Sequence, residues 1–177
     1  MSTLSVTTLQ GLASSPTPTT IEVASGHTLD ASNGLTTPAG HIIQTVESQG
    51  IFTEVTTTGS SFVNSNMQLA ITPKFANSFI LFKARCWCSG NQASGGIRLQ
   101  VTRNGVNFEG GNLAVGEVSR TSGPSYWEEV QHIEVLDKTH NSTSALTYIV
   151  TLLSAGGTAR VGVSNRTGTI IIQEIAQ

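Results

Sequence analysis

Cys86 and Cys88, separated by one residue, are the first place in the sequence where redox or metal chemistry could arise. On a strand their side chains point the same way with Cα atoms about 7 Å apart, too far for an unstrained disulfide. A zinc site needs four ligands. The four histidines, at positions 27, 41, 132 and 140, show no ligand spacing with the cysteines. The pattern therefore predicts buried apolar thiols, with no metal and no cofactor.

The only concentration of acidic residues comprises Glu128, Glu129, Glu134 and Asp137. Paired carboxylates can hydrolyse glycosidic bonds. Adjacent strand residues face opposite ways, however, so Glu128 and Glu129 cannot share a substrate. Solvent-facing positions, or a partner for Lys138, are the favoured interpretation. The chain also lacks a G-x-S-x-G sequence and a P-loop, and its Ser, His and Asp residues are too dispersed for a triad. The sequence thus predicts no catalytic residue and a protein that is not an enzyme.

Tyr126 and Trp127 follow Gly123-Pro124, where an exposed loop could present aromatic rings to a carbohydrate. They are the candidates for contact with a glycan. A position in the core or at a subunit interface is the alternative, and it is favoured for this pair.

Composition excludes several classes of function. The 177 residues include 20 Ser and 24 Thr, only 11% charged residues, and a formal net charge of −2. Such a chain favours strands and shows no basic cluster for binding nucleic acid. It also contains no apolar run long enough for a membrane span, and its first residues do not resemble a secretory signal. We expect neither nucleic acid nor membrane as a partner.

Charge is distributed unevenly along the chain. All 9 Lys and Arg residues follow position 73, and the first 73 residues contain only acidic charges. Apolar residues near the N-terminus occur in short bursts separated by Ser, Gly and Pro, too short to build a core. We therefore predict an extended arm over residues 1–48 that docks on a partner or on sister chains, with a disordered tail as the alternative.

Residues 49–177 show the alternation of an all-β domain. About eight strands are expected, at a spacing typical of a sandwich or barrel, and no segment has a helical period. In the longest, residues 79–88, one face carries Ile80, Phe82, Ala84, Cys86 and Cys88, which predicts the core face. Arg103-Asn104-Gly105 indicates a hairpin turn. The apolar spacing shifts phase once in the group Tyr126-Trp127, Val130, Ile133 and Val135, which indicates a bulge.

Several segments resemble the C-terminal module of tailed-phage virion proteins. They are Met67-Gln-Leu-Ala-Ile-Thr-Pro-Lys74, Asn77-Ser-Phe-Ile-Leu81, Leu99-Gln-Val-Thr-Arg-Asn-Gly105, Thr147-Tyr148 and Thr169-Ile-Ile-Ile-Gln-Glu-Ile175. Two N-terminal segments, Leu4-Ser-Val-Thr-Thr-Leu-Gln10 and Pro38-Ala-Gly-His-Ile-Ile-Gln44, are similar to segments of phage fibre and decoration proteins.

The resemblance implies an antiparallel β-sandwich of the jelly-roll, tumour-necrosis-factor-like kind, forming a homotrimer on the virion surface after assembly in the host cytoplasm. The family often has Lys where this chain has Phe79. With Leu81 and Trp87, Phe79 makes the second face of this strand too apolar for solvent. Either a second layer or a subunit interface must cover this face, and burial against symmetry mates in a trimer fits a closed ring.

The leading hypothesis is a capsid decoration (cement) protein that binds the major capsid protein or another virion protein and stabilises the head. The expected docking residues in its arm are Leu4, Val6, Leu9, Ile21 and Val23. The alternative is a tail fibre or receptor-binding tip, whose loops around residues 89–96 and 119–127 contact a host surface glycan.

Overall fold

The computed structural model describes residues 38–91, 95–107, 115–120, 126–163 and 165–177, apart from the side chain of Arg120. The chain divides into two compact units, and the fold below is that of the second, Thr37–Gln177. The predicted docking residues Leu4, Val6, Leu9, Ile21 and Val23 lie outside the described residues.

The described residues form strands and no helix, which confirms the all-β prediction. The strands are β1 (Ile42–Ile51), β2 (Val55–Thr57), β3 (Val63–Ile71), β4 (Phe79–Gly90), β5 (Gly95–Arg103), β6 (Val106–Asn107), β7 (Gly116–Arg120), β8 (Trp127–Asp137), β9 (Leu146–Ser154), β10 (Ala159–Val161) and β11 (Thr167–Ile175). None of the described residues belongs to a helix that is long and apolar enough to cross a membrane.

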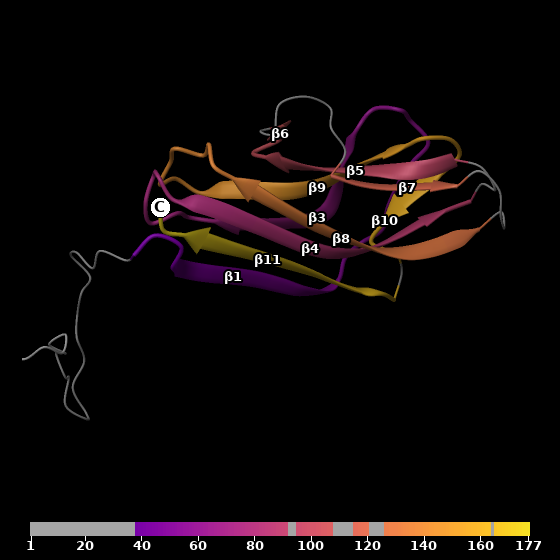
Figure 1. Ribbon diagram of the computed structural model, residues 1–177. Coiled ribbons are helices and arrows are strands. Elements are labelled where there is room, and N and C mark those ends of the chain that lie inside the picture. Colours follow the sequence, from indigo (N-terminus) through magenta and orange to yellow (C-terminus); the bar gives the residue numbers. More distant parts are fainter. Residues whose placement is uncertain (1–37, 92–94, 108–114, 121–125, 164) are drawn as a thin grey trace, which may run out of the picture. The chain divides into compact units, whose positions relative to one another are not determined.

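Two antiparallel sheets pack face to face (Figure 1). In the first sheet, β8 pairs with one side of β4, and both β11 and β10 pair with its other side. Strand β1 then pairs with β11, and β2 pairs with β10. In the second, the order is β3, β9 and β5, and both β6 and β7 pair with the free side of β5.

Three pairs of segments, β1 with β2, β6 with β7, and β10 with β11, are therefore interrupted halves of longer strands. The eleven segments correspond to eight strands in two four-stranded sheets, the arrangement of a jelly roll. Eight was the number expected from the sequence.

Strand β4 supplies one wall of the core. Its inward residues Ile80, Phe82, Ala84, Cys86 and Cys88 are all at most 5% exposed, as predicted. They face alternating apolar residues of β5 and β9, and the ring of Phe82 stacks on that of Tyr148 with centroids 6.0 Å apart. Contact between the two sheets thus rests on the alternation that was visible in the sequence.

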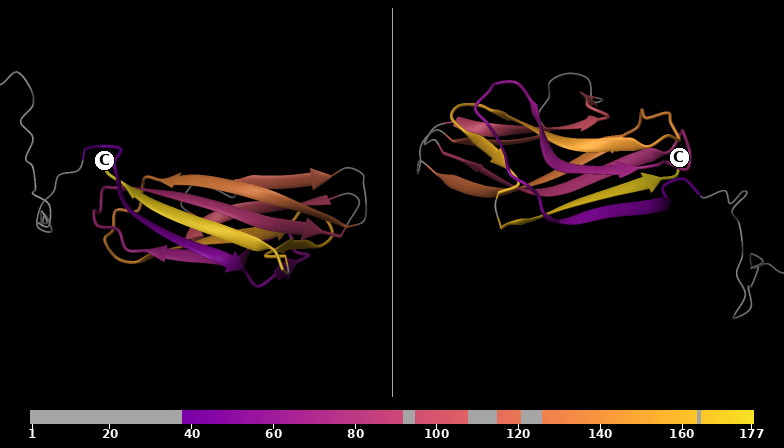
Figure 2. Two further views of the ribbon diagram at one scale, coloured as in Figure 1. Left: turned by 90° about the horizontal axis from the view of Figure 1, so that it is seen from below. Right: turned by 180° about the vertical axis from the view of Figure 1, so that it is seen from behind.

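Strand β1 corrects the predicted boundary between arm and sandwich. It begins at Ile42 and pairs with β11 as far as Ile51, so residues 42–48 belong to the sandwich rather than to the arm (Figure 2). The edge strand has few apolar residues because only one of its faces meets the core, and its stability comes from the ladder with β11. The predicted arm is accordingly shorter than residues 1–48.

The hairpin predicted at Arg103-Asn104-Gly105 is confirmed. Strand β5 turns into β6 with positive φ angles at both central residues, 51° at Asn104 and 77° at Gly105. This is the geometry of a type I′ turn, whose twist matches that of the flanking strands.

Candidate functional site: the outer face of the β4 sheet

The two cysteines are buried and unreactive in character. Cys86 and Cys88 are both fully buried, and their sulfur atoms lie 3.8 Å apart without a disulfide. The hydrogen bond with Cys86, together with burial, raises the pKa of Cys88, so this thiol stays protonated. The prediction of buried apolar thiols is confirmed. Within the described ranges, His, Cys, Asp and Glu side chains form no cluster of three or more that could hold a metal.

The four acidic residues of β8 lie on both faces of the sheet and have different surroundings. Glu128 lies opposite Ser89 and Glu129 opposite Cys88, so the two adjacent carboxylates face opposite sides of the sheet, as expected. Glu134 forms an ion pair with Lys83 at 3.3 Å rather than with Lys138.

Asp137 is not solvent-facing, which corrects the sequence-based expectation. It is 1% exposed and accepts hydrogen bonds from the Tyr148 hydroxyl at 2.7 Å and from the Thr139 amide at 2.8 Å. It also forms an ion pair with Arg103. Burial alone would raise the pKa of Asp137, but the hydrogen bonds from these three residues outweigh it and lower the pKa.

Glu174 is a second buried carboxylate, and its burial was not predicted from the sequence. It accepts hydrogen bonds from the backbone amides of Lys74 and Phe75, both at 2.9 Å, from Ser78 Oγ at 2.7 Å, and from Gln44 Nε2 at 2.6 Å. Burial opposes ionisation, yet these donors lower the pKa of Glu174. The carboxylate fastens the β3–β4 loop to β1 and β11, so its role is structural. Its isolated position in an apolar strand was the only available signal.

The two candidate glycan residues lie in different environments. Tyr126 is 51% exposed, and its hydroxyl donates to Glu128 at 2.6 Å. Trp127 is 5% exposed and belongs to the core. Its ring occupies the space where a side chain at Gly90 would otherwise project. Trp127 as a glycan contact is therefore wrong, because a buried ring cannot stack on a ligand, whereas Tyr126 remains available.

The outer face of the β4 sheet is defined as the side of β1, β11, β4 and β8 that points away from the core. Phe79, Leu81 and Trp87, the predicted interface residues, all lie on this face and are all half-buried. They do not form one patch. Trp87 is eight residues from Phe79, about 27 Å along the strand, and the charged side chains of Lys83 and Arg85 lie between.

Phe79 and Leu81 instead join apolar residues of neighbouring strands. Phe79 lies opposite Ile175, which in turn lies opposite Ile42, and Leu81 lies opposite Leu136. We call these five residues the apolar end patch. Ile42 is 55% exposed and Leu136 is 38% exposed, so a substantial part of the patch faces outward.

Trp87 lies in a separate cluster at the other end of the face. The guanidinium of Arg166 lies 4.7 Å from the centre of its ring and also binds Glu128 at 3.1 Å. Tyr126 completes this cluster through its bond to Glu128. One face of the Trp87 ring is thus covered within the subunit.

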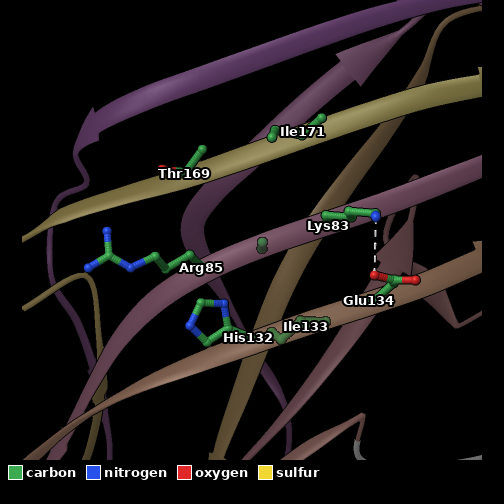
Figure 3. Close-up of a pocket in the computed structure, with 8 residues that line it drawn as sticks. Lys83, Arg85, His132, Ile133, Glu134, Thr169 and Ile171 are labelled. Atoms are coloured by element: carbon green, nitrogen blue, oxygen red, sulfur yellow. Dashed lines mark ion pairs between the residues drawn. The ribbon is translucent and has the colours of Figure 1, made fainter.

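A hollow of about 350 Å³ lies in the middle of the outer face, between the apolar end patch and Trp87. It is lined by Lys83, Ala84, Arg85, His132, Ile133, Glu134, Thr169 and Ile171. Arg85 lies directly between Thr169 on β11 and His132 on β8. Figure 3 shows the Lys83–Glu134 ion pair at one side of the hollow. The side chain of Arg85 extends away from this ion pair.

The face thus combines an apolar end, a polar hollow and an aromatic–arginine cluster. None of these brings together a nucleophile, a base and an orienting group, and the arrangement is suited to contact with another molecule. Comparison with models of known protein families and with curated protein sequences finds no match to this chain.

Proposed function

We propose that this protein is a non-enzymatic structural component of a tailed-phage virion, where it acts as a trimeric capsid decoration protein. The observation that carries self-association is the apolar end patch, with Ile42 55% and Leu136 38% exposed on an otherwise mixed surface. Association with a second copy removes such a patch from water at about 25 cal/mol per Å².

The assignment to a virion is supported by the resemblance of the strand-ending and hairpin sequences to phage virion proteins, together with the jelly-roll connectivity. The preference for the head over the tail rests on the N-terminal segment, which has no Lys or Arg and many short strand-like bursts.

Such a segment can add its backbone to exposed strand edges of the shell by β-augmentation. Joining three copies multiplies the weak contacts of the individual arms through effective concentration. A protein that binds the assembled shell but not its dissociated subunits stabilises the shell by linkage.

Two measurements test the proposal. Sedimentation of the recombinant protein at micromolar concentration is expected to give a trimer, and Phe79→Lys or Leu81→Lys is expected to give a folded monomer. Deletion of residues 2–24 is expected to leave the trimer intact and abolish its association with purified particles. A monomeric wild-type protein, or full decoration by the truncated one, would overturn the proposal.

Tyr126 favours a second candidate function, a tail fibre or receptor-binding tip that contacts a glycan. Its ring is 51% exposed beside Glu128 and Arg166, a combination of aromatic surface and charged hydrogen-bonding groups suited to a sugar. Copy number separates the two functions, since a decoration protein is present in hundreds of copies per particle and a tail protein in at most a few dozen. Binding of host envelope polysaccharide that is lost in Tyr126→Ala would favour the second candidate.

A further inference from the structure

Arg85 differs from the other arginines whose side chains the structure describes. Arg98, Arg103, Arg160 and Arg166 each form an ion pair with a carboxylate. Arg85 is exposed and forms no ion pair within the described ranges. Its nearest potential counter-charge in the hollow, Glu134, is already bound by Lys83 at 3.3 Å. The hollow therefore has an uncompensated positive charge.

Glu47 has the complementary property. It lies exposed on the edge strand β1 and has no ion pair or hydrogen bond among the described residues. The carboxylates Glu54, Glu117, Glu128 and Glu134 are each bound by a cation. Glu47 and Arg85 thus both project from the outer face of the β4 sheet without an ion-pair partner among the described residues.

Within one subunit these two side chains project from different strands and form no ion pair. Glu47 lies opposite Ile171 on β11, and Arg85 lies opposite the neighbouring outward residue, Thr169. Two strand spacings and one step along the strand separate their Cα atoms by about 12 Å. Ile171 lies between them and lines the hollow (Figure 3).

A cyclic trimer joins two different surfaces of each copy, so an edge strand of one copy can face the sheet of the next. We propose that the hollow around Arg85 receives the Glu47 carboxylate of a neighbouring copy, with Arg85 as its ion-pair partner and His132 and Thr169 beside it. This inference rests on the proposed self-association and names the polar contact that orients it.

The contact explains why the face contains both apolar and charged residues. Burial of the apolar end patch favours association of the subunits but does not determine their orientation, because burial of apolar surface is not directional. A charged hydrogen bond between a carboxylate and a guanidinium has a defined geometry, and it suppresses arrangements that leave either charge buried alone. Glu47 and Arg85 would therefore select one register of subunits.

Charge reversal tests the pair. We expect Glu47→Arg and Arg85→Glu each to weaken self-association by about a hundredfold, because each places like charges together. The double variant Glu47→Arg/Arg85→Glu is expected to recover it. Both residues are exposed, so thermal unfolding should show that all three variants fold. Gln68→Arg, an exposed position on the other sheet, is the matched control and should assemble as wild type does.

Mixing the two single variants distinguishes a contact between copies from one within a copy. Between copies, the introduced arginine of one variant meets the introduced glutamate of the other. A mixed trimer then has two opposite-charge contacts and one like-charge contact, so an equimolar mixture should associate more strongly in sedimentation than either single variant alone. A mixture that associates no more strongly than the single variants, while the double variant assembles, would place the pair within one subunit and overturn the inference.

The inference also fails if both single variants assemble like wild type, or if the double variant does not recover. These outcomes are separate from failure of the proposed function, which would appear as a wild-type protein that does not self-associate at all.

Discussion

Asp137 and Glu174 lie directly on either side of Ile80 in the β4 sheet, and both carboxylates point into the sandwich. They are 1% and 0% exposed, so two buried negative charges lie within the same end of one small domain. Each is satisfied separately, Asp137 by Arg103 and Tyr148 and Glu174 by backbone amides and polar side chains. Buried charges of this kind are tolerated only with a full set of partners.

The pair predicts that the domain is sensitive to acid. The pKa values of Asp137 and Glu174 are both lowered on folding, from ordinary values of 3.8 and 4.5. The stability that they contribute is therefore present above about pH 4.5 and is lost as pH falls through the lower pKa values of the folded state.

Urea denaturation measured between pH 6 and pH 2 checks this expectation. Wild-type stability should decline steeply at acidic pH, and Glu174→Gln should decline less steeply from a lower starting value. Gln68→Ala, at an exposed position, should keep the wild-type slope. An unchanged slope in Glu174→Gln would show that this carboxylate does not titrate with unfolding.

Tyr148→Phe should cost about 1 to 2 kcal/mol, because it removes the hydroxyl that donates to Asp137 at 2.7 Å. The ring itself would stay stacked on Phe82. A double-mutant cycle with Asp137→Asn measures the coupling between the two side chains. We expect the double variant to be more stable than the sum of the single losses implies, and strict additivity would contradict the proposed pairing.

The thiols of Cys86 and Cys88 should not react with a thiol reagent at pH 8 in the native protein. Both side chains are fully buried, and the pKa of Cys88 is raised by its hydrogen bond with Cys86 and by burial. Two thiols per chain should react once the protein is unfolded in guanidinium. Rapid reaction of the folded protein would show that the core opens on the timescale of the assay.

Gly96→Ala should destabilise the sandwich by about 2 kcal/mol or more. A Cβ atom at this position would lie 2.0 Å from the carbonyl oxygen of Val118, which belongs to the paired strand β7 and cannot move without disrupting the ladder. Gly116→Ala, in the same strand pair, is the matched control, since its nearest contact would be an ordinary 3.6 Å to Leu99. Equal midpoints in chemical denaturation would contradict the steric argument.

Trp127→Ala should cost about 3 to 5 kcal/mol, because it leaves a cavity beside β4 where the ring now packs. Tyr126→Ala, one residue away and 51% exposed, should change stability by less than about 0.5 kcal/mol. Thermal unfolding of the two variants distinguishes the buried ring from the exposed one. A small effect at Trp127 would indicate that its pocket collapses on truncation.

The fold could be predicted from the sequence wherever one strand face is uniformly apolar. The inner face of β4 was predicted in this way from its apolar residues 80, 82, 84, 86 and 88. The hairpin was predicted from Asn104-Gly105, a pair of residues typical of a type I′ turn. Strand β1 could not be found by the same pattern. Its residues are mostly polar, and its pairing with β11 depends on backbone hydrogen bonds that every sequence can make.

Strand β8 shows a second limit. The shift of apolar phase within residues 126–135 indicated a bulge, but β8 pairs with β4 without a break in register. Val130 instead lies on the outer face opposite Trp87. An apolar residue can point outward when an aromatic ring on the paired strand lies beside it. The sequence of one strand does not show which strand pairs with it, so this placement could not be predicted.

Only part of the candidate face could be predicted, because the sequence of one strand does not show its neighbouring strands. Phe79, Leu81 and Trp87 were correctly assigned to one face of a strand, since alternation determines that. Phe79 and Leu81 lie apart from Trp87, and they pack beside Ile42, Leu136 and Ile175. This arrangement depends on which strands lie beside β4, so alternation within one strand does not predict it. The buried positions of Asp137 and Glu174 likewise depend on partners from distant parts of the chain.

Two backbone hydrogen bonds join the start of the sandwich to its end, from the Gly40 amide to the Ala176 carbonyl and from the Ala176 amide to the His41 carbonyl, both at 2.8 Å. The first and last residues of the sandwich are therefore neighbours in space. A short linker between these positions, with new termini opened at Gly156-Gly157, would give a circular permutant with the same strand pairs. In such a protein, a fused peptide would leave from the end opposite the apolar end patch.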